Sequence, residues 1–212
     1  IVPISTSDAT QRGYVVASPD YRLVYGDSNQ FPAAIEDVKC AVRWLRANAD
    51  KYNIDPDRIG AAGSSSGAHL ALLLGVTDSA DGLDGDREYL DYSSSVQAVV
   101  SLGGPPDLAS SYRDVSSFRG MISLFLGGVP EDVPATYRDA SPVTYLDAKD
   151  PPMLTFLGTN DFLIPVQHIA SFDAKARAIG ASHTAAFYEG GHAAPPLDLL
   201  NEGMYGFFDM HL

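Results

Sequence analysis

Short apolar runs alternate with helical patterns along most of the chain. Five runs predict buried strands: Tyr14–Ser18, Arg58–Ala62, Val96–Leu102, Met153–Leu157 and Thr184–Tyr188. Apolar residues recur at helical spacing in four other segments: Phe31–Lys51, His69–Val76, Val166–Ile179 and Leu197–Met210. Continuous apolar runs are typical of parallel strands covered on both faces, and regular alternation with helices is typical of βαβ units. The pattern therefore predicts an α/β fold, with a mostly parallel sheet and helices on both of its faces.

Residues 107–149 interrupt this alternation. They are rich in Ser, Pro and Gly, and they contain one compact apolar stretch, Met121–Leu126, which suits either packing or a lid. No internal repeat and no linker divides the chain. We therefore expect a single domain over residues 1–212, in which residues 107–149 form a small cap-like insertion over the strand ends.

The sequence Gly63-Ser64-Ser65-Ser66-Gly67 fits the pattern G-x-S-x-G, and it lies between a predicted strand and a predicted helix. A sharp turn at this position strains the backbone of the central serine and leaves little room for neighbouring side chains. The helix that follows directs its first amides toward the serine, where they stabilise developing negative charge. The pattern predicts that Ser65 is a nucleophile and that the Ser66 amide is an oxyanion donor.

A serine nucleophile needs a base, and the base needs an acid that orients it. His192 comes directly after the last predicted strand, in Glu189-Gly190-Gly191-His192, and Asp161 comes directly after the strand before it. The carboxyl ends of parallel strands meet at one edge of a sheet, where open α/β folds build their sites. We therefore predict a catalytic triad of Ser65, Asp161 and His192, in an order known for this type of triad.

Other polar residues have simpler explanations. His69 lies within the helix that follows Ser65, where its ring is expected to pack or to cap. Asp147 and Asp150 are rival acids, but they precede a strand and so belong at the wrong end of the sheet. The acidic segment 81–91 lacks the spacing of an EF-hand, and the chain has no H-E-x-x-H or paired-cysteine pattern. We expect no metal and no cofactor.

Composition and charge exclude several classes of protein. Hydrophobic residues make up 45% and charged residues 19% of the chain, which argues against disorder. The net charge of −13 disfavours binding to nucleic acid or to an anionic membrane surface. The single cysteine, Cys40, cannot form an intrachain disulfide. Neither a spanning segment nor a signal peptide is recognisable, so the compartment stays open, with a cytoplasmic location slightly favoured.

At this point the sequence resembles a known family. The matching segments are Gly13–Val16, Asp20–Leu23, Asp37–Lys39, Arg43–Leu45, Asp55–Ile59, Gly63–Ala71, Ser141–Val143, Gly158–Asp161 and Gly190–His192. The set resembles the α/β-hydrolase superfamily, in its hormone-sensitive-lipase-like and BD-FAE (feruloyl- and acetyl-esterase-like) branch. The resemblance implies a serine esterase with Ser65 as nucleophile, His192 as general base and Asp161 as the orienting acid.

The chain departs from this family in one respect. Such enzymes normally carry further strands and a His-Gly-Gly-Gly loop before the segment that begins here at Gly13, and that loop supplies half of the oxyanion hole. Only twelve residues precede Gly13, and none resembles the loop. The resemblance thus implies an N-terminally truncated fold with Tyr14–Ser18 near a sheet edge. A longer chain, a partner or a rearranged loop, such as Gly103-Gly104, would have to supply the second donor.

The preferred hypothesis is a serine carboxylic-ester hydrolase that forms an acyl-enzyme on small-molecule esters with short acyl chains. A peptidase or amidase of the same fold is the first alternative. A catalytically impaired hydrolase-like protein, without a complete oxyanion hole, is the second. The sequence leaves open the natural acyl and alcohol groups and whether the chain forms a homo-oligomer.

Overall fold

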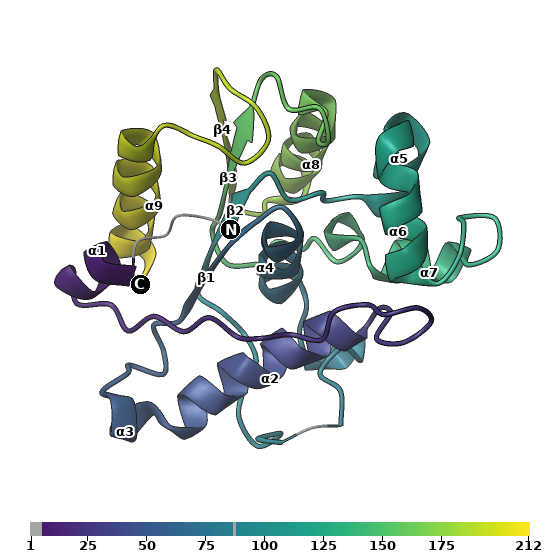
Figure 1. Ribbon diagram of the computed structural model, residues 1–212. Coiled ribbons are helices and arrows are strands. Elements are labelled where there is room, and N and C mark those ends of the chain that lie inside the picture. Colours follow the sequence, from purple (N-terminus) through teal and green to yellow (C-terminus); the bar gives the residue numbers. More distant parts are fainter. Residues whose placement is uncertain (1–5, 87) are drawn as a thin grey trace.

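The computed structural model describes residues 6–86 and 88–212. Four strands form one parallel sheet in the order β1-β2-β3-β4 (Figure 1). Their bounds are β1 Gly60–Ser64, β2 Ala98–Leu102, β3 Met153–Gly158 and β4 His183–Tyr188. The register places Gly63 beside Ser101 and Ser101 beside Thr155. The predicted parallel sheet is confirmed, and all four strands end at the same edge.

Helices connect and flank these strands. The longer ones are α2 Ala33–Ala47, α4 Ser66–Val76, α8 Val166–Ile179 and α9 Leu197–His211. The shorter ones are α1 Thr6–Gln11, α3 Ala49–Tyr52, α5 Leu108–Asp114, α6 Arg119–Leu126 and α7 Pro134–Asp139, with 3-10 turns at Ser79–Asp81, Ser116–Phe118 and Pro142–Thr144. Each of the four predicted helical segments is present. The first is divided at Asn48 into α2 and α3.

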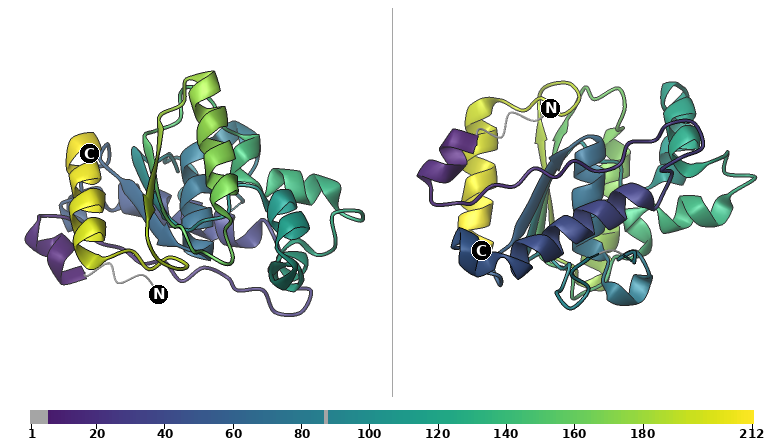
Figure 2. Two further views of the ribbon diagram at one scale, coloured as in Figure 1. Left: turned by 90° about the horizontal axis from the view of Figure 1, so that it is seen from above. Right: turned by 60° about the horizontal axis from the view of Figure 1, so that its bottom comes forward.

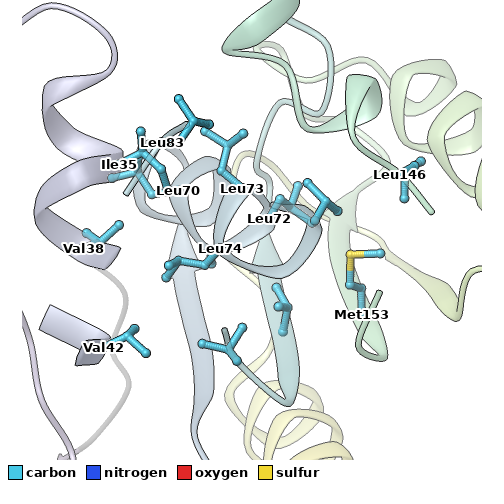
Figure 3. Packing of buried hydrophobic residues seen from close by; sticks show 14 of the residues in the cluster. Ile35, Val38, Val42, Leu70, Leu72, Leu73, Leu74, Leu83, Leu146 and Met153 are labelled. Atoms are coloured by element: carbon cyan, nitrogen blue, oxygen red, sulfur yellow. The ribbon is translucent and has the colours of Figure 1, made fainter. Parts of the chain in front are cut away.

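Helices α2, α4 and α8 cover one face of the sheet. The apolar residues of α4 meet Ile35, Val38 and Val42 of α2 on one side, while Val99 of β2 and Met153 of β3 belong to the same cluster (Figure 3). Helix α4 is buried along nearly its whole length because it lies between α2 and the sheet. This burial explains why its sequence is apolar on all sides.

Helices α9 and α1 cover the opposite face (Figure 2, left). Residues that alternate with Val99 and Met153 along the strands point to this side, as the pleat of a strand requires. The cluster contains, among others, Val100, Leu102, Leu154, Phe156, Leu200, Met204 and Phe208. The predicted helices on both faces are therefore confirmed.

The predicted buried strand Tyr14–Ser18 is wrong. The segment is extended but forms no strand within the described chain, and Val15 and Val16 are 53% and 39% exposed. A strand needs a neighbour for its backbone groups, and no described strand lies beyond β1 on that side of the sheet. Apolar side chains alone could not reveal that this partner is missing.

Side chains hold the extended segment in place instead. Tyr14 Oη donates to Asp209 Oδ1 of α9 at 2.6 Å. Arg22 Nε donates to Asp37 Oδ2 at 2.8 Å, and its Nη2 donates to Glu36 Oε2 at 2.9 Å, both on α2. Residues 14–22 thus connect the helices that cover the two faces of the sheet.

Residues 107–149 form a helical unit beside the sheet, made of α5, α6, α7 and short 3-10 turns. Ile122 and Leu126 of α6 are buried in a cluster that includes Leu157 of β3 and Ile169 of α8. Met121 and Leu124, on the same helix, are 60% and 50% exposed. The apolar stretch therefore packs on one side and faces solvent on the other, and its role as a cap stays a prediction.

Two buried cations on α2 share one carboxylate. Lys39 Nζ and Arg43 Nη1 lie 3.4 Å and 3.3 Å from Asp84 Oδ1, and the two cationic side chains are 0% and 1% exposed. Ser94 Oγ also donates to Asp84 Oδ1, at 2.6 Å. Burial alone would raise the pKa of Asp84, but these partners hold it below its ordinary value. Asp84 therefore fixes the loop after α4 to α2.

Within residues 6–86 and 88–212, no helix combines the length and the apolar character needed to cross a bilayer.

Candidate active site

The turn between β1 and α4 places Ser65 in a strained backbone conformation. Its φ of 51° and ψ of −116° lie outside the regions that a non-glycine residue ordinarily adopts. The Ser65 amide donates to the Leu102 carbonyl at 2.9 Å, which ties the turn to the end of β2. The serine side chain is thereby presented at the carboxyl edge of the sheet.

The two glycines of the turn have different roles. A Cβ at Gly63 would lie 2.2 Å from the carbonyl oxygen of Gly67, so no side chain fits there. A Cβ at Gly67 would have no described heavy atom within 4 Å. The expectation that neighbours of the serine must lack side chains therefore holds for Gly63 and not for Gly67.

The structure brings the three predicted triad residues together. His192 Nε2 lies 2.9 Å from Ser65 Oγ, and His192 Nδ1 lies 2.8 Å from Asp161 Oδ2. The three residues follow the ends of β1, β3 and β4. Ser65 and His192 are 127 positions apart in the sequence. If Nδ1 carries the hydrogen and donates it to Asp161, Nε2 is free to accept the Ser65 proton. This is the arrangement of a serine nucleophile with its base and its orienting acid.

Asp161 is fixed by backbone amides as well as by His192. Its side chain is fully buried, and its Oδ1 accepts hydrogen bonds from the Leu163 and Ile164 amides, both at 2.9 Å. Burial by itself would raise the pKa of Asp161, but the hydrogen bonds from His192 and from these two amides outweigh it and lower the pKa. Asp161 is therefore a carboxylate at neutral pH.

The expected oxyanion donor, the Ser66 amide, lies directly after the nucleophile, and its role in catalysis stays a prediction. Ser66 opens α4, and the first amides of a helix have no partner within it, so the Ser66 amide is available to a ligand. Gly103 does not supply a second donor, because its amide donates to the Phe156 carbonyl at 3.0 Å. The Gly103 part of the proposed Gly103-Gly104 replacement is therefore excluded, and a contribution from Gly104 stays a prediction. The φ of Gly103 is +64°, and a Cβ there would lie 3.3 Å from His192 Cε1, so glycine leaves room for the imidazole.

His69 is a buried packing residue. Its Nδ1 lies 2.9 Å from the Pro105 carbonyl, and its ring meets Phe125 edge-on with centroids 6.1 Å apart. Its Nε2 has no hydrogen-bond partner among the described residues. Burial lowers the pKa of His69 to about 4, despite the opposing effect of the Pro105 carbonyl. The imidazole is therefore neutral at pH 7, with Nδ1 as donor.

The rival acids Asp147 and Asp150 lie before β3, at the opposite edge of the sheet from Ser65. Burial raises the pKa of Asp150 to about 6. In the part of the chain that the structure describes, no three His, Cys, Asp or Glu side chains are grouped so as to hold a metal ion.

A second Asp–His–hydroxyl array lies inside the protein, and no sequence pattern indicated it. His183 Nδ1 is 3.0 Å from Asp173 Oδ1, and His183 Nε2 is 3.0 Å from Thr155 Oγ1. The His183 side chain is fully buried, and burial lowers its pKa to about 4. Thr155 is also fully buried. The array therefore joins α8 to β3 and β4 within the core.

Sequence reasoning also missed the residues that surround the triad. The Leu163 and Ile164 amides act through the backbone, so no side-chain pattern could indicate them. The one available signal for Phe162 was its position as an apolar residue directly after the predicted acid. Its ring centroid lies 6.4 Å from that of His192, and the residue is 72% exposed.

Comparison with known proteins identifies the family. The family model BD-FAE matches residues 3–176, which is more than half of the chain. The chain belongs to the BD-FAE family. The region of this BD-FAE chain that matches includes Ser65 and Asp161 and ends before His192.

Relatives of the BD-FAE chain include Esterase LipC of Mycobacterium tuberculosis. It is 36% identical over 178 residues, an alignment that covers 81% of this chain and 42% of LipC. The chain thus spans about two fifths of the length of this curated relative.

Solved structures show that the BD-FAE chain has an α/β-hydrolase fold. A truncated form of a carbohydrate esterase from gut microbiota has a TM-score of 0.79 at 30% identity, covering 90% of this chain and 72% of that one. An acetyl ester-xyloside bifunctional hydrolase from Caldicellulosiruptor lactoaceticus has a TM-score of 0.69 at 26% identity, covering 90% and 66%. That the present chain is a truncated version at its N-terminal side stays a prediction.

Proposed function

We propose that this BD-FAE protein is a serine carboxylic-ester hydrolase that acts on small-molecule esters through an acyl-enzyme. The observation that carries the proposal is the continuous hydrogen-bonded chain from Ser65 through His192 to Asp161, with distances of 2.9 Å and 2.8 Å. Family membership and the esterase names of the relatives support the same reaction class.

In the first half of the reaction, Ser65 Oγ attacks the acyl carbon while its proton passes to His192 Nε2. Asp161 keeps the imidazole oriented and stabilises the imidazolium that forms. The carbonyl oxygen becomes an oxyanion, which the Ser66 amide and the N-terminus of α4 stabilise. His192 then gives the proton to the alcohol oxygen, the ester bond breaks, and the acyl group stays on Ser65.

In the second half, water takes the place of the alcohol. His192 Nε2 accepts a proton from that water, whose oxygen attacks the acyl carbon of the Ser65 ester. Collapse of this second tetrahedral intermediate returns the proton to Ser65 Oγ and releases the carboxylic acid. The cycle consumes one water and needs no redox partner.

The number of amide donors in the oxyanion hole affects the turnover number of this reaction. If the Ser66 amide acts alone, turnover is expected to be lower by about 10²–10³-fold than with two donors. For the acyl group we propose short chains such as acetyl, in keeping with the acetyl ester named for one solved relative.

Labelling with a fluorophosphonate tests the assignment directly. The reagent should modify Ser65, as identified by mass spectrometry of the labelled peptide, and Ser65→Ala should abolish the adduct. No adduct, or an adduct at another residue of the intact protein, would overturn the proposal. Comparison of 4-nitrophenyl acetate with the matching anilide, 4-nitroacetanilide, distinguishes an esterase from an amidase, because an amidase would also turn over the anilide.

A further inference from the structure

Phe162 is an exposed aromatic residue in direct contact with the candidate catalytic base. Its ring lies 6.4 Å from the imidazole of His192, measured between centroids, with an angle of 62° between the two planes. The residue is 72% exposed, although it lies between Asp161, whose side chain is buried, and Ile164, which is fully buried. Exposing a phenylalanine costs the free energy that its burial would have provided, so its packing within the described chain does not explain its position.

The backbone around Phe162 is held firmly. The amides of the two residues that follow it, Leu163 and Ile164, both donate to Asp161 Oδ1. The Asp161 amide itself donates to the Gly158 carbonyl at 3.1 Å. The loop that orients the acid of the triad therefore also fixes where the Phe162 ring stands. A fixed apolar surface loses little conformational entropy when a ligand packs on it.

The position of His192 indicates which part of an ester reaches this surface. During acylation His192 Nε2 must give its proton to the alcohol oxygen, so that oxygen comes within hydrogen-bond distance of the imidazole. The group attached to the alcohol oxygen then lies beside His192, whereas the acyl chain extends from the carbon bonded to Ser65. Phe162 is an exposed aromatic residue whose ring pairs with this imidazole, so its ring is a candidate for contact with the alcohol side of the substrate.

We infer that Phe162 is a specificity-determining residue, whose ring binds the alcohol group of the ester and favours alcohols that carry a ring. Aromatic rings prefer edge-to-face or offset contacts with other rings, and Phe162, at 72% exposure, has free surface with which to make such a contact. This inference rests on the proposed esterase function and adds to it the class of leaving group.

The test compares two acetates with the same acyl group and alcohols of similar basicity, benzyl acetate and butyl acetate. We expect Phe162→Ala to lower the ratio of kcat/KM for benzyl over butyl acetate by about three- to tenfold. Phe162→Tyr, which keeps the ring, should preserve the ratio. Because damage to the triad affects both acetates alike, a purely structural role for Phe162 would leave the ratio unchanged.

Phe187→Ala is the matched control, since Phe187 is also exposed, at 44%, and lies within β4. It should not change the ratio. An unchanged ratio in Phe162→Ala, or an equal change in Phe187→Ala, would overturn this inference and leave the esterase assignment intact. Absence of turnover of both acetates by the unaltered intact protein, together with an unlabelled Ser65, would overturn both.

Discussion

The buried imidazole of His69 makes the stability of the protein sensitive to mild acid. Its pKa is about 4 in the folded protein, against about 6.5 for an exposed histidine. The unfolded chain therefore binds more protons than the folded one between these two values, and the free energy of unfolding falls as the pH drops below 6.5. For this one group, the loss relative to pH 8 is about 2 kcal/mol at pH 5 and approaches about 3 kcal/mol well below pH 4.

His69→Gln removes the titration and keeps an N–H for the Pro105 carbonyl, which His69 Nδ1 contacts at 2.9 Å. The free energy of unfolding, from urea curves followed by circular dichroism at pH 5, 6, 7 and 8, should depend less on pH in the variant. The free energy of unfolding of His69→Gln, measured relative to that of the unaltered protein, should be about 2 kcal/mol more favourable to the folded state at pH 5 than at pH 8.

His211→Gln serves as the control, because His211 ends α9 and is only half-buried. Other acid-titrating groups are common to all three proteins and cancel in the comparison. If the difference between the unaltered protein and His69→Gln were the same at pH 5 and pH 8, the reasoning from burial would be refuted.

Three further outcomes are expected. Asp161→Asn should lower kcat on 4-nitrophenyl acetate by about 10³–10⁴-fold, because His192 loses its orienting carboxylate; a loss below tenfold would contradict this role. Gly63→Ala should lower the free energy of unfolding by about 1–3 kcal/mol or more, whereas Gly67→Ala should change it by less than about 1 kcal/mol, as measured by urea unfolding; equal effects would contradict the steric argument. Asp84→Asn leaves two buried cations without their shared carboxylate, so unfolding at pH 7 should become easier by about 3–5 kcal/mol; an unchanged urea midpoint would show that these cations are solvated.

The sheet and its main helices could be predicted from the sequence because both depend on local patterns. Apolar runs located β2 and β3, and helical spacing located α8 with the bounds that the structure has, Val166–Ile179. The prediction of a strand at Tyr14–Ser18 was wrong because it depends on a distant part of the molecule. Whether an extended apolar segment becomes a strand depends on a partner elsewhere in the molecule, and the run itself carries no information about that partner.

The candidate site divides in the same way. Ser65, Asp161 and His192 were predictable because each side chain follows a recognisable strand and parallel strands share a carboxyl edge. The Leu163 and Ile164 amides were not, since any residue supplies an amide and only the loop conformation directs it toward Asp161. The hydrogen bond of the Gly103 amide to the Phe156 carbonyl could not be predicted either, because it depends on how β2 and β3 are paired.

The strained backbone conformation of Ser65 lowers the stability of the fold, while the serine hydroxyl at the same position is needed for catalysis. Glycine adopts such a conformation freely, so Ser65→Gly should relieve strain worth about 1–3 kcal/mol while removing the only atom there able to attack an ester. A population of variants selected for heat resistance alone would drift toward glycine at this residue. If serine persisted in competition with the more stable glycine variant, the hydrolytic activity would have to be under selection as well.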